Sequence, residues 1–386
     1  MNGECFWLHN DVTIIPGEGI DKSFLERKNQ FMQRPDLSNV DPAVVAYIEY
    51  LERKAGVRPG EGRPLASRAA VREEEPAVPE RAEPLPAERE TTASIITITR
   101  EGYAKRTYRH LFHRQHRGGM GVFGIDLMGD DEPAILSCAE ENQNLLFFTS
   151  RARVFRQPLS VIVDGPLNAR GSSLAGRFNL EQDETLVAVL PEQARGYVAL
   201  VTASGRVRSL RHHLFGEHMR PGTAMFNYNE VGPLASVCWT SGDGELFILT
   251  QEGIGIRFAE KAISPQGDQG IRLSGSDRVV AITPVSEDSG VFMVSSDGRG
   301  TIRQMSGFAA NKSPGGSGKT AIKSNRVVGA VTIERNDDIF LFSRLGKVVR
   351  FPADEVPTTE GVVQGVNCMG LRGDEVVAVL KSGPIY

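Results

Sequence analysis

The stretch IFLFSRLGKVVRF, residues 339–351, contains the pattern that decides the fold of this chain. Four mostly apolar residues lead into Ser343, a short turn is centred on Gly346, and a strand that carries Arg350 follows. Five more copies lie upstream: IITITREGYAKR (95–106), LLFFTSRARVFR (145–156), VALVTASGRVRSL (198–210), LFILTQEGIGIRF (246–258) and FMVSSDGRGTIRQ (292–304). Their turn residues are Gly102, Ala152, Gly205, Gly253 and Gly298, and successive turns are 45 to 53 residues apart. A repeat of this length is typical of propellers and other repeat architectures.

Two further features of the copies predict short strands joined by hairpins. A Ser or Thr stands three positions before every turn residue, at Thr99, Thr149, Thr202, Thr250, Ser295 and Ser343. Each unit also ends in a second apolar run, such as DETLVAVL (183–190) or DEVVAVL (374–380). Hairpin turns with positive φ favour glycine, which leaves Ala152 as the exception among the turn residues.

Six such units predict an all-β fold, a six-bladed β-propeller. A single blade cannot bury both faces of its sheet, so the blades must stack around an axis. An unrelated all-β sandwich is the alternative, and it does not predict a repeat of this length. We expect the blades at about residues 94–143, 144–196, 197–244, 245–290, 291–338 and 339–386.

The first 93 residues differ in character from the repeats. Residues 1–56 predict a small helical extension, because Val44, Val45, Ile48 and Leu51 recur at helical spacing before Gly56. Residues 57–93 are rich in Pro, Glu, Ala and Arg and predict a flexible, disordered linker, since they lack the apolar surface that offsets ordering entropy.

Charge is distributed unevenly along the chain. The net charge is −4, but residues 94–386 hold 32 basic and 31 acidic residues, and residues 94–128 hold six basic and two acidic ones. A polyanion would therefore dock on the propeller rather than on the acidic N-terminal part. The sequence has neither a long apolar run nor a secretory signal, and its four cysteines lie far apart without a CxxC pair. We expect no membrane interaction, reduced thiols and a cytoplasmic, nucleoid-associated location.

The first unit carries a more specific signal. It opens with GYAKRT (102–107), and QHRGGMG follows at Gln115 to Gly121. The chain from about residue 94 to 386 resembles the C-terminal domain of the gyrase A protein and of its topoisomerase IV relative. The heptapeptide is similar to the gyrase-A box, Q-R-R-G-G-K-G, with His116 in place of Arg and Met120 in place of Lys. The resemblance implies the β-pinwheel variant of the propeller, in which the box lies on the first blade and closes a DNA wrap.

Both departures from the box remove a permanent positive charge, so they bear on the strength and chirality of wrapping. Glycines let a backbone approach a phosphate closely, and Lys and Arg release counterions when they neutralise phosphates. The box therefore gives the first candidate DNA contacts: Gln115, His116, Arg117, Gly118, Gly119, Met120 and Gly121. A solvated basic loop is the alternative interpretation for an isolated charge run.

Basic residues near the hairpins of all six units extend this set. If the blades are equivalent, these side chains form a curved basic rim along which DNA would bend. The rim residues are Lys105, Arg106, Arg109, Arg114, Arg151, Arg153, Arg156, Arg206, Arg208, Arg211, Arg257, Arg299, Arg303, Lys319, Lys347 and Arg350.

Two other motifs do not predict ligand sites. SPGGSGKT (313–320) lacks the first glycine of a phosphate-binding loop and precedes a short strand rather than a long helix. His110, His113 and His116 lie near neither cysteines nor acidic partners, so we expect no metal site and no cofactor.

The sequence thus predicts a non-catalytic protein that binds duplex DNA without sequence preference, bends it and wraps it. The relatives cleave DNA through a tyrosine in a separate N-terminal domain, for which residues 1–93 are too short, so we expect no enzyme activity and no small-molecule substrate. Double-stranded DNA is the expected partner, and a topoisomerase core or a gyrase-B-type subunit is a second one. The main alternative is a protein–protein interaction platform that has lost DNA wrapping. An enzyme built on a propeller would need clustered carboxylates or histidines, which the sequence does not show.

Overall fold

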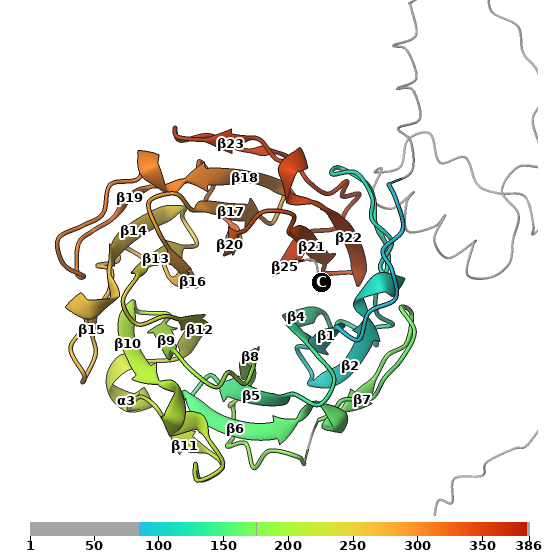
Figure 1. Cartoon of the computed structure of the whole chain (residues 1–386), viewed down its shortest axis with the longest axis horizontal. Coiled ribbons are helices and arrows are strands. Elements are labelled where there is room, and N and C mark those ends of the chain that lie inside the picture. Colours follow the sequence, from blue (N-terminus) through green and yellow to red (C-terminus); the bar gives the residue numbers. More distant parts are fainter. Residues whose placement is uncertain (1–84, 175, 384–386) are drawn as a thin grey trace, which may run out of the picture. The chain divides into compact units, whose positions relative to one another are not determined.

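The computed structural model describes residues 85–174 and 176–383, which form a six-bladed β-propeller (Figure 1). The predictions for residues 1–56 and for 57–84 lie outside the described residues. Six strands line the centre: β4 (Pro133–Ala139), β8 (Leu186–Pro191), β12 (Leu234–Thr240), β16 (Val279–Val285), β20 (Val327–Ile333) and β25 (Val376–Ser382). The prediction of six blades is confirmed.

Each blade continues outward from its central strand through a hairpin. The second strands are β1 (Ser94–Thr99), β5 (Asn144–Thr149), β9 (Tyr197–Thr202), β13 (Glu245–Thr250), β17 (Gly290–Ser295) and β21 (Asp338–Ser343). The third strands are β2 (Tyr103–Tyr108), β6 (Arg153–Pro158), β10 (Arg206–Arg211), β14 (Ile254–Ala259), β18 (Arg299–Gln304) and β22 (Lys347–Pro352). A 3-10 turn follows each third strand: η1 (Arg109–Leu111), η2 (Leu159–Val161), η3 (His212–Phe215), η4 (Glu260–Ala262), η5 (Met305–Gly307) and η6 (Ala353–Glu355). One short helix, α3 (Tyr228–Val231), lies before β12.

The outermost strand of each blade comes from the next repeat in the sequence. These strands are β7 (Ser172–Ser173), β11 (Thr223–Ala224), β15 (Asp268–Gln269), β19 (Lys319–Thr320) and β23 (Thr358–Thr359) on blades one to five, and β3 (Val122–Phe123) on blade six. Blade five also receives β24 (Val366–Asn367). Each predicted blade range therefore supplies three strands to its own blade and passes its remaining strand, or two strands in the last range, to the preceding blade. The ring closes because β3, from the first repeat, pairs with β22 of the last blade.

The shared shape of the hairpins explains the repeated Ser or Thr. In the first copy Gly102 N donates to Thr99 O at 3.0 Å, and Tyr103 N donates to Thr99 Oγ1 at 3.2 Å. Gly102 has φ +83°, and Ala152 takes the same left-handed conformation with φ +55°. The hydroxyl thus accepts a hydrogen bond from the N–H that follows a residue of positive φ. At Ala152 an alanine adopts the left-handed backbone conformation that the other five copies give to glycine.

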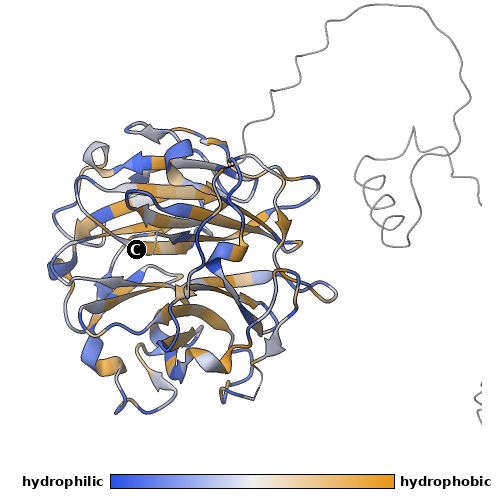
Figure 2. Cartoon of the chain, turned by 45° about the vertical axis from the view of Figure 1, so that its right-hand side comes forward, coloured by the Kyte–Doolittle hydropathy of each residue, from blue (hydrophilic) through white to orange (hydrophobic). Residues whose placement is uncertain are grey.

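The apolar second strands are buried on both faces. In LLFF, Leu145 and Phe147 pack in the core between blades one and two, whereas Leu146 and Phe148 pack between blades two and three. Side chains alternate along a strand, so a strand between two blades must be apolar at every position. Figure 2 shows hydrophobic residues concentrated on the strands and hydrophilic residues on the connections.

The seam between the first and last blades differs from the other five interfaces. Its core contains six buried residues, Ile95, Phe112, Phe340, Phe342, Val348 and Ala378, fewer than any other interblade cluster. Phe112 packs edge-on against Phe340 with ring centroids 5.6 Å apart. Polar contacts described below add to this small apolar contact.

Candidate nucleic-acid interface

The box segment leaves blade one and lies along blade six. Gln115 N donates to Arg350 O at 2.7 Å, and Gly118 N donates to Cys368 O at 2.8 Å. From the other side, Gly370 N donates to Gly119 O at 2.9 Å. The segment then enters β3, whose Val122 and Phe123 pair with β22. The box belongs to the first repeat in sequence, yet it docks on the last blade and closes the ring.

Glycine is required in the box by contact with protein backbone. Gly121 has φ +70°, and a Cβ there would lie 2.5 Å from Val348 O. Gly118 has φ +80° and its N–H is already given to Cys368 O. The sequence interpretation assigned these glycines to a close approach to phosphate. The structure shows that Gly121 serves the approach to blade six, whereas Gly118 is favoured by its positive φ.

The polar side chains of the box are anchored to Glu355 and to the β24 strand. His116 Nδ1 lies 2.7 Å from Glu355 Oε1, and Arg117 N donates to Glu355 Oε2 at 2.7 Å. Arg117 also donates from Nε to Glu355 O at 2.8 Å and from Nη1 to Asn367 O at 3.1 Å. Arg117 and Met120 nevertheless remain exposed.

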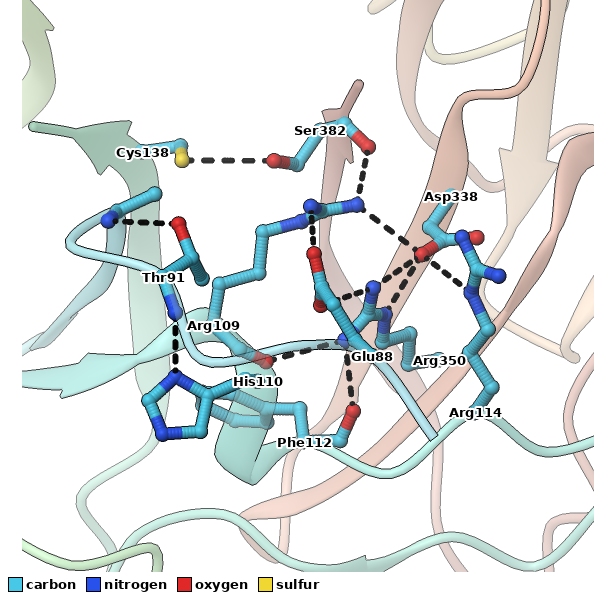
Figure 3. Close-up of polar contacts among 11 residues, drawn as sticks. Glu88, Thr91, Arg109, His110, Phe112, Arg114, Cys138, Asp338, Arg350 and Ser382 are labelled. Atoms are coloured by element: carbon cyan, nitrogen blue, oxygen red, sulfur yellow. Dashed lines mark hydrogen bonds and ion pairs between the residues drawn. The ribbon is translucent and has the colours of Figure 1, made fainter. Parts of the chain in front are cut away.

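A charged cluster lies beside the box at the seam of the ring (Figure 3). Asp338 Oδ2 accepts hydrogen bonds from Arg109 Nη2 at 3.1 Å, Arg114 Nε at 3.0 Å and Arg350 Nε at 2.7 Å. Glu88, from the end of the predicted linker, forms ion pairs with Arg109 and, at 2.6 Å, with Arg350 Nη2. The linker prediction therefore needs a correction at its end, because an ion pair holds Glu88 against the propeller.

Five of the predicted rim residues are buried in this structure and do not face solvent: Lys105, Arg109, Arg257, Arg303 and Arg350. Each has partners inside the protein. Lys105 Nζ donates to Pro166 O at 2.8 Å and to Leu167 O, and burial lowers its pKa to about 8. Arg257 Nε donates to Glu245 Oε2 at 2.6 Å. These charges are used for contacts inside the propeller, because a buried cation is stable only when paired or hydrogen-bonded.

A second group of predicted rim residues is partly or fully accessible but forms ion pairs. Arg151 and Arg153 pair with Glu181 and Glu184, and Arg156 pairs with Glu192. On blade five Arg299 Nε lies 3.8 Å from Asp297. Arg114 pairs with Asp338, as described above. Phosphate contact by these residues would compete with an existing carboxylate.

Seven predicted residues remain accessible and, in the described part of the chain, have no ion pair with a carboxylate. They lie on the third and outermost strands or in the box, and we call them the perimeter belt: Arg106, Arg117, Arg206, Arg208, Arg211, Lys319 and Lys347. The belt covers blades one, three, four and six and is interrupted at blades two and five, where the arginines are paired. Two further exposed lysines, Lys312 and Lys323, flank Lys319 in the segment that blade four receives, and sequence reasoning missed them because they lie outside the hairpins.

The two motifs for which no ligand site was predicted are SPGGSGKT and the histidine series. Within SPGGSGKT, Gly315 N donates to Gly270 O at 2.9 Å, Gly316 O accepts from Arg272 N at 2.9 Å, and Lys319–Thr320 forms β19. Among the described residues no group of three or more His, Cys, Asp or Glu is placed to hold a metal ion. Burial raises the pKa of Cys368 to about 12 and raises those of Cys138 and Cys238. In the same part of the chain, no helix is long and apolar enough to cross a membrane.

These features define a class of protein, the six-bladed β-pinwheel with exchanged outer strands and a glycine-rich box at the ring closure. The propeller is similar to the family described as DNA gyrase C-terminal domain, beta-propeller, whose model matches residues 93–132, 143–191, 244–286 and 337–382. The DNA gyrase A protein of Haloquadratum walsbyi is 28% identical over 308 residues, which are 75% of this chain and 36% of that protein. The DNA gyrase A protein of Mycobacterium leprae is 27% identical over 303 residues, 75% of this chain and 24% of that protein.

Solved structures agree with this assignment at the level of the fold. A DNA gyrase A C-terminal domain superposes with a TM-score of 0.66 at 22% identity, over 75% of this chain and 99% of that one. The C-terminal domain of a DNA topoisomerase IV gives a TM-score of 0.55 at 20% identity, and the match covers 76% of this chain and 94% of that domain. The chain spans about a third or less of the length of the gyrase proteins that it matches.

Proposed function

We propose that this propeller binds duplex DNA along its perimeter without sequence preference, bends it and wraps it, acting without a catalytic step. The perimeter belt carries the proposal, because its seven cations lie on the outer strands of four blades or in the box and have no carboxylate partner among the described residues. DNA contact with such a belt would involve phosphates rather than base edges, and binding would fall steeply with salt. The domain would act alone or beside a topoisomerase core or gyrase-B-type subunit.

The test is a topology assay on nicked circular DNA, ligated with increasing protein and then deproteinised. A variant with the whole box replaced by alanine is unsuitable, because Gly121→Ala alone would place Cβ 2.5 Å from Val348 O. The informative variant carries Arg211→Gln, Lys319→Gln and Lys347→Gln, on three blades of the belt. Its matched control carries Arg151→Gln, Arg299→Gln and Arg344→Gln, which removes the same charge from arginines that already pair with Glu181, Asp297 and Glu375.

We expect the natural protein and the control to shift the linking number and the belt variant to shift it much less. Binding without a shift would mean attachment or bending without wrapping. Equal losses in the two triple variants would contradict a DNA path along the belt.

A protein-interaction platform is the second candidate function, and an exposed apolar patch favours it. Met120, Val122, Phe123 and Leu345 are 45% to 52% exposed along the outer edge of blade six, beside the box. Exposed apolar patches often mark protein interfaces. Met120→Lys restores the lysine of the gyrase-A box and distinguishes DNA binding from a protein-interaction platform. A rise in DNA affinity supports DNA contact at the box, whereas no DNA binding at low salt by either protein supports the platform.

A further inference from the structure

The charged cluster at the ring seam has more positive than negative charge. Arg109, Arg114 and Arg350 face Asp338 and Glu88. The side chains of Arg109 and Arg350 are 0% and 1% exposed, and Asp338 is 1% exposed. Burial, followed by the nearby Arg350, lowers the pKa of Arg109. Its Nε is buried and has no hydrogen-bond partner among residues 85–174 and 176–383. Three buried or half-buried guanidiniums thus depend on two carboxylates, one of which is supplied by residues outside the blades.

Glu88 is a replaceable member of this cluster. It belongs to residues 85–93, which reach blade one through Thr91 N to His110 Nδ1 at 3.2 Å, Thr92 Oγ1 to Glu140 Oε2 at 2.8 Å, and Arg109 N to Ala93 O at 2.8 Å. Among the described residues upstream of Thr91, Glu88 forms ion pairs with the propeller, through Arg109 and Arg350. Asp338, by contrast, is part of β21 and cannot leave without unfolding the blade. Release of residues 85–90 would therefore remove one carboxylate and leave the three arginines with Asp338 alone.

An uncompensated pair of buried guanidiniums strongly favours an anion from solution. Arginine presents planar, paired donors that match the oxygens of a phosphate. The site also adjoins the box, since Arg114 precedes Gln115 and Arg350 O accepts from Gln115 N at 2.7 Å. The position thus lies on the same edge as Arg117 of the perimeter belt.

We propose that Arg109 and Arg350 form a phosphate-binding site that Glu88 occupies in this structure, with Arg114 adjacent to it on Asp338. The Glu88 carboxylate stands in for a phosphate group, so the end of the linker competes with an anionic ligand at the ring seam. The ligand chemistry is a phosphate oxyanion, either a phosphodiester of DNA or free phosphate. The DNA source rests on the proposed function, whereas the site for free phosphate does not.

The experiment compares Glu88→Ala with Glu90→Ala in the full chain. Glu90 lies on the same segment, is exposed and has no ion pair or hydrogen bond among the described contacts, so both variants lose the same charge at nearly the same place. The first measurement is the thermal midpoint during a titration with inorganic phosphate. General salt effects act on both variants alike. We expect a saturable rise of the midpoint with Glu88→Ala in addition to the salt effect common to both variants, and no saturable rise with Glu90→Ala.

A second variant and a second measurement complete the test. If Glu88→Ala does not fold, Glu88→Gln replaces it in the same titration, because the amide keeps the volume and loses the charge. DNA affinity is then measured against salt. We expect Glu88→Ala to bind several-fold more tightly than Glu90→Ala, with a salt slope steeper by about 0.9, the value for one added phosphate contact.

The outcomes separate the two sources of phosphate and the two proposals. A phosphate-dependent rise without a gain in DNA affinity assigns the site to free phosphate. Identical phosphate titrations for the Glu88 and Glu90 variants overturn the site. Absence of DNA binding by all variants contradicts the proposed function and leaves the phosphate titration to decide this inference by itself.

Discussion

At the scale of single residues, Asp338 is the carboxylate on which the arginines of the seam cluster depend. One of its carboxylate oxygens accepts from three arginines while the side chain is 1% exposed. We expect Asp338→Asn to lower the free energy of unfolding by about 3 kcal/mol or more, since loss of one partner leaves buried cations uncompensated. Urea unfolding of Asp338→Asn beside Asp354→Asn, an exposed aspartate of η6, measures the difference. Equal midpoints for the two variants would show that the cluster contributes little.

Lys105 gives the propeller a pH dependence of defined sign. Burial lowers its pKa from 10.5 to about 8, so between these values the unfolded chain binds more protons than the folded one. Stability contributed at this site therefore rises as the pH increases from about 8 to 10.5, and is absent below that window. We expect a gain on the order of 2 kcal/mol relative to Lys105→Met, which does not titrate. The check is denaturant unfolding of both proteins at pH 7, 9 and 10; parallel profiles would contradict the assignment.

At the scale of elements, the exchanged strand β3 and the box form one structural unit with blade six. Gly121→Ala should destabilise this unit strongly, because its Cβ would meet Val348 O at 2.5 Å in addition to the cost of φ +70°. Gly129→Ala is the matched control, with φ +55° and open space around the Cβ. We expect a loss of about 1 kcal/mol for the control and clearly more for Gly121→Ala.

Thermal unfolding and limited proteolysis within residues 109–132 measure this difference. Faster cleavage of Gly121→Ala than of Gly129→Ala would show that the segment has come off blade six. Similar cleavage rates would mean that the box docks through its side chains rather than through close backbone contact.

At the scale of the whole molecule, the distribution of unpaired cations decides how DNA would bind. The belt residues lie on blades one, three, four and six, so no single blade supplies the whole contact. We expect Lys319→Gln to weaken binding equally for DNA of different sequences and to lower the slope of log K against log salt by about 0.9. Arg299→Gln, which removes a cation already near Asp297, should change the slope less. Binding isotherms at several salt concentrations, on two DNA duplexes of unlike composition, test both statements.

Much of the molecule followed from sequence pattern alone. The six copies with Ser or Thr three residues before the turn predicted the propeller and its hairpins, because that spacing places a hydroxyl under a turn of positive φ. The family was also recognisable, since QHRGGMG retains most of the box. Apolar runs such as LLFF predicted the short strands of the blades. These features depend only on residues close together in the sequence, so they can be recognised within each repeat separately.

Three results were decided only by the tertiary structure. The outermost strands have two residues each, too few for sequence to show that each joins the preceding blade or that β3 closes the ring. The basic residues near the hairpins look alike in sequence, yet Arg257 and Arg350 are buried beside carboxylates while Arg211 and Lys319 are exposed. Glu88 lies in a stretch whose composition predicts disorder, and it is held by Arg109 and Arg350, the latter more than 250 residues away. Pairing between distant residues sets which charges are free, and composition and periodicity carry no information about such pairs.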